Sequence, residues 1–327
     1  MRYIVGPLLL AGLGCTLGCT RPQPVKLAVD PSLARLVPVD TILLTGVRVQ
    51  ELRATPLYRK LESRGGAGVR EMTDLLAKSG FDVNKDVSAL LIASNGVSTI
   101  IMAKGSFKIA TLDALRESGP KSGSKSASGR KSEYKGRAIY GDGDGSFTLL
   151  DDSTAVAGSA ASVRAAIDLA AAGGASGHPL LAAAASLPVT SQIWAVGTDL
   201  GVFADRYVPR EGNLANARRL LKSTKSVTLS ADMTTGVKAS IAGTCASDQD
   251  AKLLNDTLRG ILGLGRLSVP EERRELLRLY DGVKVERRDL TIHLEIDQPA
   301  ELLDKLIDMF APPASLGLFP YPEGGAA

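Results

Sequence analysis

The sequence predicts an α+β protein with two similar β-α-β-β-α-β-β-α units, in which mainly antiparallel sheets carry helices packed on one face. Three observations support this prediction. Short apolar, β-branched segments are joined by tight turns, which favours antiparallel pairing. Amphipathic or alanine-rich segments of helical length separate these strands. The same order of segments occurs twice along the 327 residues.

Composition narrows the class of protein before any element is placed. Hydrophobic residues make up 44% of the chain and charged residues 23%, which is typical of a folded globular protein. A net charge of +4 and only 4% aromatic residues argue against a nucleic-acid partner. With two histidines and three cysteines, the chain offers little for a transition-metal site, so we expect no metal and no cofactor.

The N-terminus has the pattern of a secretory signal. Arg2 precedes the uncharged apolar run Tyr3–Leu13, and small residues and cysteines follow it. The run is shorter than the ~20 residues that a membrane-spanning helix needs. We therefore expect residues 1–18 to be a cleaved signal peptide.

Two cysteines, Cys15 and Cys19, each follow a glycine at the end of this run. This pattern resembles the lipobox of bacterial lipoproteins, and the resemblance implies cleavage before the cysteine and its acylation. Cys19 is the favoured residue because a polar, proline-containing segment follows it, whereas the residues after Cys15 remain apolar; Cys15 is the alternative. Thr20, in place of the aspartate that tends to retain lipoproteins at the inner membrane, favours the outer membrane.

The first unit is predicted over residues 38–176, after a tether at 19–37. A strand at 41–49 leads into a helix at 52–62, and the Asn95-Gly96 turn joins strands at 90–94 and 99–107. The remaining elements, in order, are a helix at 111–117, strands at 134–140, 147–150 and 155–156, and a helix at 161–172. The Ser/Gly/Lys-rich stretch 119–131 is predicted to be a flexible loop.

The second unit is predicted over residues 177–310, followed by a flexible tail at 311–327. Its elements are strands at 192–198, 227–233, 237–245, 280–285 and 290–296, with helices at 201–207, 248–262 and 300–309. We match the starts 41, 90 and 134 of the first unit with 192, 227 and 280 of the second, at separations of 151, 137 and 146 residues. These similar separations predict a duplication.

The phrase Val37-Pro38-Val39-Asp40-Thr41 before an apolar strand resembles the opening of a group of uncharacterised bacterial envelope proteins with a VPADT-like motif. Later steps of that pattern are Gly80-Phe81-Asp82 and Val156-Ala157-Gly158. The resemblance covers most of residues 37–175 and implies a similar fold. It implies no activity.

Alternation along the strands assigns the conspicuous polar and reactive residues to faces. Cys245 shares the apolar face of its strand with Val237 and Ile241, which predicts a small buried side chain rather than a nucleophile. His293 shares a polar face with Glu295 and Asp297, and His178 precedes a proline at a helix start, where it is expected to cap the helix.

No set of residues in the sequence forms a convincing catalytic motif. The Ser-x-x-Lys spacings between Ser118 and Lys135 occur in a low-complexity stretch that produces them by chance. Residues 142–145, Asp-Gly-Asp-Gly, begin like a calcium loop, but Phe147 and Ser153 occupy the positions that need glycine and an acidic ligand, so a tight hairpin turn is preferred. We assign no catalytic residue and do not expect an enzyme.

One cluster of charge stands out. Its basic residues are Lys121, Lys125, Arg130, Lys131, Lys135 and Arg137, against a single Glu133. A solvated insertion is the simpler interpretation, and contact with anionic lipid or glycan of the envelope is the sharper hypothesis.

Together these observations predict a lipid-anchored envelope protein that acts as a non-catalytic binding or scaffold protein. Its partners would be the membrane, through the N-terminal acyl chains, and envelope proteins or anionic lipid or glycan. A carrier of lipid or another apolar ligand is the alternative, and it requires a cavity lined by Leu, Ile, Val and Phe. A hydrolase with an unrecognised site is the third hypothesis.

Overall fold

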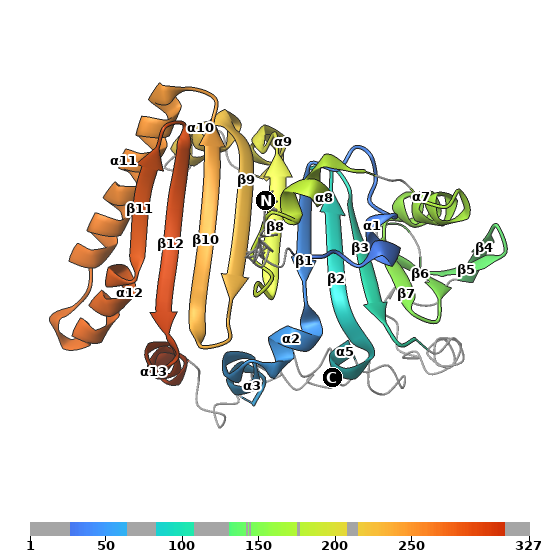
Figure 1. The fold of residues 1–327 in the computed structure, drawn as a ribbon, viewed down its shortest axis with the longest axis horizontal. Coiled ribbons are helices and arrows are strands. Elements are labelled where there is room, and N and C mark those ends of the chain that lie inside the picture. Colours follow the sequence, from blue (N-terminus) through green and yellow to red (C-terminus); the bar gives the residue numbers. More distant parts are fainter. Residues whose placement is uncertain are drawn as a thin grey trace, which may run out of the picture.

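The computed structural model describes residues 27–63, 83–107, 131–141, 143, 145–174, 177–207 and 215–310. Its strands form one 12-stranded sheet in the order β11-β12-β10-β9-β8-β1-β2-β3-β7-β6-β5-β4, and every neighbouring pair is antiparallel (Figure 1). The α+β class is therefore confirmed, with a single sheet that runs through both halves of the chain.

The first half comprises the described residues up to 174. Its strands are β1 (Leu43–Val47), β2 (Val87–Ser94), β3 (Thr99–Gly105), β4 (Lys131–Tyr134), β5 (Arg137–Tyr140), β6 (Ser146–Asp151) and β7 (Thr154–Gly158). Its helices are α1 (Pro31–Ala34), α2 (Val49–Ala54), α3 (Pro56–Ser63), α5 (Val83–Asp86) and α7 (Ala160–Ala171). The Asn95-Gly96 turn forms as predicted: Asn95 Oδ1 accepts hydrogen bonds from the amides of Val97 and Ser98, and Gly96 has a φ of 83°. The predicted helix at 111–117 and loop at 119–131 lie, except for Lys131, outside the described residues.

The second half begins with α8 (Pro179–Ala184). Its strands are β8 (Ile193–Thr198), β9 (Thr224–Asp232), β10 (Gly236–Cys245), β11 (Val283–Arg288) and β12 (Thr291–Pro299). Its other helices are α9 (Gly201–Tyr207), α10 (Ala215–Ser223), α11 (Asp248–Leu267), the 3₁₀ helix η3 (Glu271–Leu276), α12 (Leu277–Asp281) and α13 (Ala300–Phe310).

The two halves have the same strand order, read outward from the β1–β8 junction. It is β1-β2-β3-β7-β6 on one side and β8-β9-β10-β12-β11 on the other. The third predicted match paired the segment at 134–140 with the strand at 280–285. In the structure, the strands equivalent to β11 and β12 are instead β6 and β7, one hairpin later in the chain. The segment at 134–140 is part of the β4–β5 hairpin, which turns at Lys135 and Gly136, both at positive φ, and adds two strands to the first half alone.

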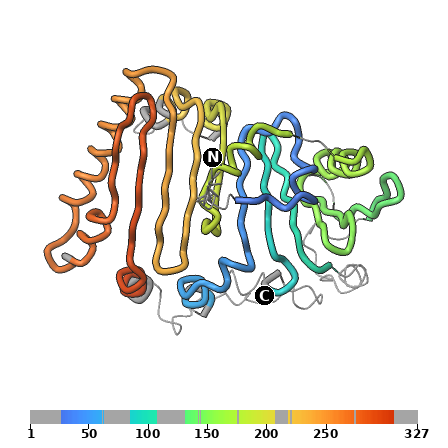
Figure 2. Tube along the Cα trace, viewed as in Figure 1, coloured from blue at the N-terminus to red at the C-terminus, as the bar shows by residue number. Residues whose placement is uncertain are grey.

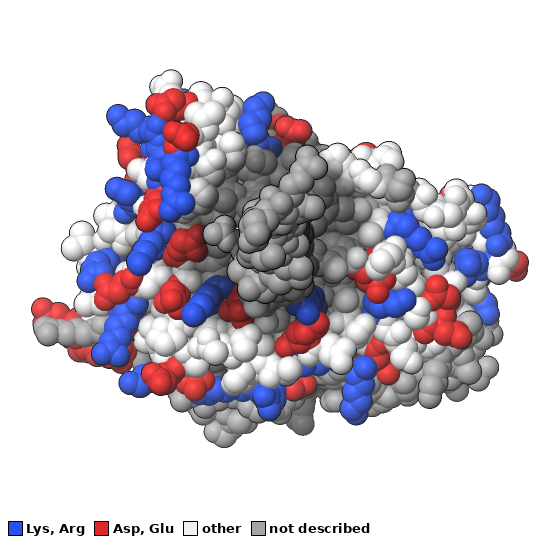
Figure 3. All heavy atoms as spheres, viewed as in Figure 1, with Lys and Arg blue, Asp and Glu red and all other residues white. Residues whose placement is uncertain are grey.

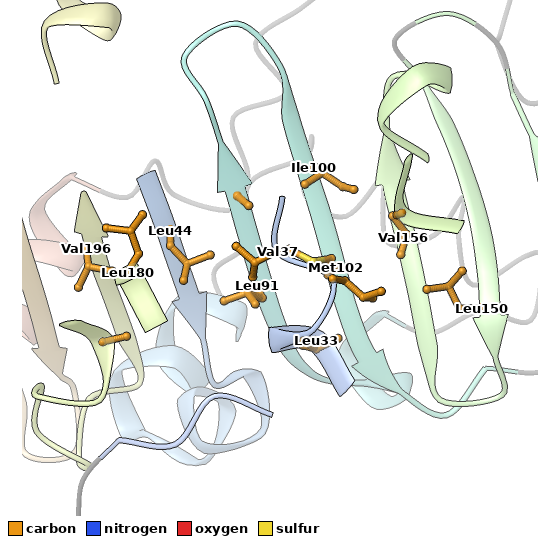
Figure 4. Packing of buried hydrophobic residues seen from close by; sticks show 14 of the residues in the cluster. Leu33, Val37, Leu44, Leu91, Ile100, Met102, Leu150, Val156, Leu180 and Val196 are labelled. Carbon is orange, nitrogen blue, oxygen red and sulfur yellow. The ribbon is translucent and has the colours of Figure 1, made fainter. Parts of the chain in front are cut away.

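Strand register shows which side chains share a face. Ser230, Trp194, Gly46, Leu91 and Met102 form one row across β9, β8, β1, β2 and β3. We call this side the α8 face, because the apolar side chains on it pack against α8, α1 and α7 (Figure 4). The neighbouring row, which contains Leu229, Ala195, Thr45, Ile92 and Ile101, lies on the opposite side, here called the α11 face.

The two halves bury apolar residues on opposite faces of the shared sheet. In the first half, Leu44, Leu91, Met102 and Val156 lie on the α8 face beneath the helices. In the second half, β8 still contributes Trp194 and Val196 to this α8-face cluster. Beyond it, the packed side chains lie on the α11 face, where Cys245, Val285 and Ile292 meet α11. The prediction that helices cover one face is therefore met within each of these clusters, but the side changes between halves.

No helix among the described residues is both long and apolar enough to cross a membrane. The predicted signal peptide, residues 19–26 of the predicted tether and the tail at 311–327 lie outside the described residues.

Candidate binding groove

The α8 face of the second half carries an open groove of ≈ 970 Å³. Its floor consists of side chains from β9, β10, β11 and β12, and Pro188, Thr190 and Ser191 from the segment after α8 form one wall. The groove exists because α11 packs on the opposite side of these strands, while α13 lies at their lower ends beside α3 (Figure 1). In the trace of Figure 2, no described helix crosses in front of β9, β10 and β12.

Register arranges the floor into rows of alternating charge across the strands. Asp232, Lys238 and Asp297 pair in one row of β9, β10 and β12. The next row on this face contains Ser230, Ser240, Glu295 and Lys284, and the one after it joins His293 to Glu286. Figure 3 shows the result as interspersed basic and acidic side chains over the part of the face where β11 and β12 lie.

Several floor side chains are fixed by hydrogen bonds across or along the strands. Ser240 Oγ donates to Glu295 Oε1 at 2.7 Å, and the hydroxyls of Thr244 and Thr291 lie 3.1 Å apart in a row farther along. Arg288 Nη2 donates to Glu286 Oε2 at 2.8 Å, and this bond lowers the pKa of Glu286. These contacts orient part of the floor, although Arg288 and Glu286 are 69% and 54% exposed, and groups that are oriented before binding lower its cost.

The wall is held to the floor by the buried side chain of Gln192. Its Nε2 donates to the carbonyl oxygen of Thr190 at 2.8 Å, and its Oε1 accepts from the amide of Met233 at 2.6 Å. Asp232 lies beside this linkage. Burial opposes ionisation of Asp232, but hydrogen bonds from Thr234, Thr190 and Gln192 outweigh it and lower the pKa of the carboxyl group. Asp232 is thus a carboxylate at neutral pH.

The lining favours polar partners of mixed or positive charge. Its carboxylates are Asp232, Asp281, Glu286, Glu295 and Asp297; its cations are Lys238, Lys284 and Arg288, together with the titratable His293. Counting His293 as neutral, five carboxylates against three cations give a charge of −2 on a chain whose net charge is +4. None of the described lining residues is aromatic, so this floor provides no stacking platform for a sugar or a base.

The groove does not have the lining that the apolar carrier requires. Of its described apolar residues, Ala239 and Ile296 pair in a row of the α11 face, so their side chains point away from the floor, which leaves Pro188 of the wall and Pro299. A second hollow of ≈ 250 Å³ is bounded by Ala93, Ile100, Ala161 and Ala165 together with polar residues such as Asp40 and Asn95. A third, of ≈ 350 Å³, shares Asp281, Gly282, Asp297 and Pro299 with the groove and continues its charged lining toward Glu301.

Catalytic chemistry finds little support among the described groove residues. The Ser240 hydroxyl is directed to Glu295, whereas His293 pairs in register with Ala242 and Glu286, so the hydroxyl is not bonded to the imidazole as nucleophilic catalysis needs. Throughout the described part of the chain, no group of three or more His, Cys, Asp or Glu residues is placed to hold a metal ion.

Three of the six basic residues in the predicted charge cluster lie among the described residues. Lys121, Lys125 and Arg130 lie outside the described residues, while Lys131, Lys135 and Arg137 lie on or beside the β4–β5 hairpin. Lys135 Nζ lies 2.6 Å from Asp168 Oδ1 of α7, and Arg137 donates to the carbonyl oxygen of Leu150. Lys131 Nζ lies 5.5 Å from the centre of the Tyr140 ring. These three side chains therefore have partners within the chain.

The two histidines and Cys245 occupy the predicted environments. His178 caps α8, with its Nδ1 accepting from the amide of Leu180 at 3.2 Å. His293 lines the groove on the polar face of β12. Cys245 is buried against α11, and burial raises the pKa of its thiol. Cys19 and Cys15 lie outside the described residues.

No family model matches this chain, and no curated protein matches it. Among solved structures, the chain is similar to the protein TP0453 in several crystal forms. Crystal form I has a TM-score of 0.45 and 11% sequence identity, over 87% of this chain and 99% of that chain. Crystal form IV has a TM-score of 0.47 and 11% identity, over 86% and 97%.

The polar face of β12 could be predicted from the sequence, but the groove could not. Alternation placed His293, Glu295 and Asp297 together, because they belong to one strand. Lys238, Lys284 and Asp232 join them only through the register of four strands. The alternating charges at 284, 286 and 288 were the available signal, since they indicate a strand with one solvated face.

Proposed function

We propose that this protein is a membrane-anchored envelope lipoprotein that acts as a non-catalytic binding or scaffold protein, with the groove as its binding surface. The observation that carries the binding role is the α8 face of the second half, which no described helix covers and where four strands present charged side chains in register. The partner that fits is a polar segment of an envelope protein that carries basic as well as acidic side chains, because the floor has an excess of carboxylates.

The proposed anchor rests on the sequence around Cys19. The lipobox-like ending of the apolar run supports acylation, and several acyl chains hold a protein at a membrane far more firmly than one. Thr20 supports the outer membrane as the destination. Only seven residues separate Cys19 from Leu27, which is buried in the apolar cluster under the α8 face, so the fold would lie close to the bilayer.

Metabolic labelling with a clickable fatty acid tests the anchor. We expect label on the wild-type protein and on Cys15→Ala, and none on Cys19→Ala. Label that persists in Cys19→Ala and disappears in Cys15→Ala would move the anchor to the alternative residue. An unlabelled wild-type protein would refute the lipoprotein assignment.

Site-specific photo-crosslinking in living cells tests the groove. A photoreactive amino acid at Ser240 should give a protein adduct of constant mass, and one at Val97, which is 67% exposed far from the groove, should not. The double charge reversal Glu295→Lys and Asp297→Lys should remove the adduct at Ser240. An adduct that survives both reversals would contradict recognition by the groove charges, and adducts with lipid alone would favour the carrier.

A further inference from the structure

The N-terminal end of the described chain is fixed to the α8 face. Leu27 is 3% exposed and belongs to the apolar cluster of this face. Asp30 Oδ1 accepts a hydrogen bond from the amide of Ser32 at 2.8 Å and so caps α1. Lys104 Nζ donates to Ser32 Oγ at 3.1 Å and to Ser153 Oγ at 2.9 Å, which ties α1 to β3 and to the β6–β7 turn. The chain before Leu27 therefore starts from a fixed place on this face.

That place lies near the middle of the sheet. In Figures 1 and 2 the described chain begins in front of β1, about midway along the strand, and runs across β2 to α1 beside β3. β1 is the sixth strand of twelve, and neighbouring strands are about 4.8 Å apart, so about 24 Å of sheet lies on one side of it and about 29 Å on the other. The shortest way off the face is past the ends of the strands, which lie about 13 Å away for a strand of eight residues such as β2.

The proposed anchor residue is close to this place along the chain. Eight Cα–Cα steps join Cys19 to Leu27, and a fully extended chain covers at most about 3.6 Å per step, or about 29 Å in all. To bring the α11 face against the bilayer, the tether would have to pass a strand end, about 13 Å away, and then the sheet and the helix layer of α11, about 10 Å each. This path of about 33 Å is longer than the tether. Helices α2 and α5 stand at the lower ends of β1 and β2 and lengthen it further on that side (Figure 1).

We infer that the α8 face is turned toward the bilayer that holds the acyl chains, and that the groove on this face binds the membrane-proximal segment of a protein anchored in the same membrane. The inference rests on the proposed acylation of Cys19 and on the groove as a binding surface. The groove begins two strands from β1, because β8 lies between β1 and β9. It therefore opens on the side from which the tether starts.

The lining of the groove distinguishes this partner from the bilayer itself. Pro188 and Pro299 are the described apolar side chains that face it, so it offers no surface for acyl chains. Its five carboxylates, against three Lys and Arg side chains, disfavour anionic headgroups and suit a polar protein segment that carries basic residues. Because the tether keeps the face within about 29 Å of the bilayer, roughly ten extended residues are enough for such a segment to reach the groove. Confinement to one membrane also raises the effective concentration of the two partners.

Energy transfer to labelled lipids tests the orientation. The acylated protein is bound to vesicles that carry an acceptor dye on a fraction of the headgroups, with a donor dye on Ser240→Cys in the groove or on Ile261→Cys of α11, where Ile261 is 60% exposed. The wild-type chain, in which Cys245 is buried, gives the labelling background. We expect a transfer rate several-fold higher from position 240 than from position 261.

A longer tether is the matched control. Inserting about twenty Gly and Ser residues between Val25 and Lys26 should reduce the ratio of the two rates, because a flexible tether of that length no longer restricts the orientation. Equal transfer from the two positions, or higher transfer from position 261, would overturn the orientation. Protein that does not bind the vesicles would refute the anchor as well.

Sequencing the peptide that is crosslinked to a photoreactive residue at Ser240 tests the partner. We expect a peptide of an integral membrane protein or lipoprotein that lies within roughly ten residues of its span or anchor. The double reversal Glu295→Lys and Asp297→Lys should remove this peptide, and the lengthened tether should weaken it several-fold. A peptide from a soluble protein, an adduct with lipid, or a peptide from residues 20–26 of the chain itself would overturn the proposed partner. No adduct at all, with the energy-transfer ratio intact, would refute the binding role of the groove and leave the orientation standing.

Discussion

The indole ring of Trp194 lies directly over Gly46, at the junction between the two halves. The two residues are partners in the β1–β8 register, and a Cβ built on Gly46 would lie 2.1 Å from Cε2 of Trp194. Trp194 is buried in the cluster beneath the α8 face. The largest side chain at the junction therefore occupies the space that glycine leaves.

Replacing Gly46 by alanine should destabilise the protein. The added methyl group must displace a buried ring, and overpacking of this kind costs about 1–3 kcal/mol. Urea unfolding followed by tryptophan fluorescence would measure the loss in the free energy of unfolding. Gly243→Ala is the matched control, because a Cβ on that strand glycine meets only Thr224 Cγ2, at 3.8 Å. Equal effects of the two substitutions would show that Trp194 does not set the requirement for glycine.

Gln192→Leu should loosen the groove wall and lower stability. The substitution leaves the amide of Met233 and the carbonyl of Thr190 without their partner, and a buried unsatisfied group costs about 1–3 kcal/mol. Thermal unfolding would measure the change. Gln192→Glu keeps an acceptor for the amide of Met233, so hydrogen exchange at Met233 should be affected less than in Gln192→Leu. The same variant loses the donor to Thr190 and places a second carboxylate near Asp232.

The Lys135–Asp168 pair should make the β4–β5 hairpin sensitive to acid. The hydrogen bond from Lys135, assisted by Tyr134, lowers the pKa of Asp168 below its usual value of 3.8, despite opposition from burial. Its contribution is therefore complete above pH 3.8 and is lost as the pH falls through the lowered value. Hydrogen exchange at residues 131–140 should accelerate over that range.

Asp168→Asn should produce the same acceleration at neutral pH. Asp152→Asn removes an equal charge from the neighbouring β6–β7 turn and should leave the hairpin amides unchanged. Because Lys135 and Asp168 are 55% and 43% exposed, added salt should diminish the difference between wild type and Asp168→Asn. A difference that salt does not affect would point to lost packing instead of lost charge.

Cys245 should resist thiol reagents until the chain unfolds. Burial, assisted by Asp250, raises the pKa of the thiol above its usual value of 9.0, while Arg287 opposes the shift. The thiol therefore contributes stability that is present below pH 9.0 and is lost as the pH rises through the raised value. Maleimide labelling of Cys245 should track unfolding in urea, whereas Ile261→Cys should label in the native state. Rapid native labelling of Cys245 would contradict its burial.

Sequence patterns were sufficient for most strands and for the faces within each strand. The alternation from Val237 to Cys245 predicted which side chains of β10 meet a helix, since the period of two is a property of one strand. The continuous strand predicted at 134–140 is wrong, because the chain turns at Lys135 and Gly136, both at positive φ. Asn, Asp or Gly usually occupies the first position of such a turn, so Lys135-Gly136 is a weak signal in the sequence.

The side of the sheet that each half buries could not be predicted. Alternation shows that Leu44 and Cys245 are each buried by their own strands, but not that they lie on opposite faces of one sheet. That relation depends on pairing across β1, β8 and β9, which sequence periodicity does not specify. The groove could not be predicted for the same reason, because it lies on the face that no described helix of the second half covers.

Because β1 pairs with β8, each half depends on the other to satisfy the backbone hydrogen bonds at one edge of its sheet. Cutting the chain between residues 174 and 177 and separating the products would leave β1 and β8 each with a row of unpaired amides and carbonyls. Since the two strands occupy equivalent places in the two halves, each bare edge would have the geometry to pair with a second copy of itself. Isolated halves would therefore associate through their exposed strand edges. In the intact chain, β1 and β8 pair with each other and this association is prevented.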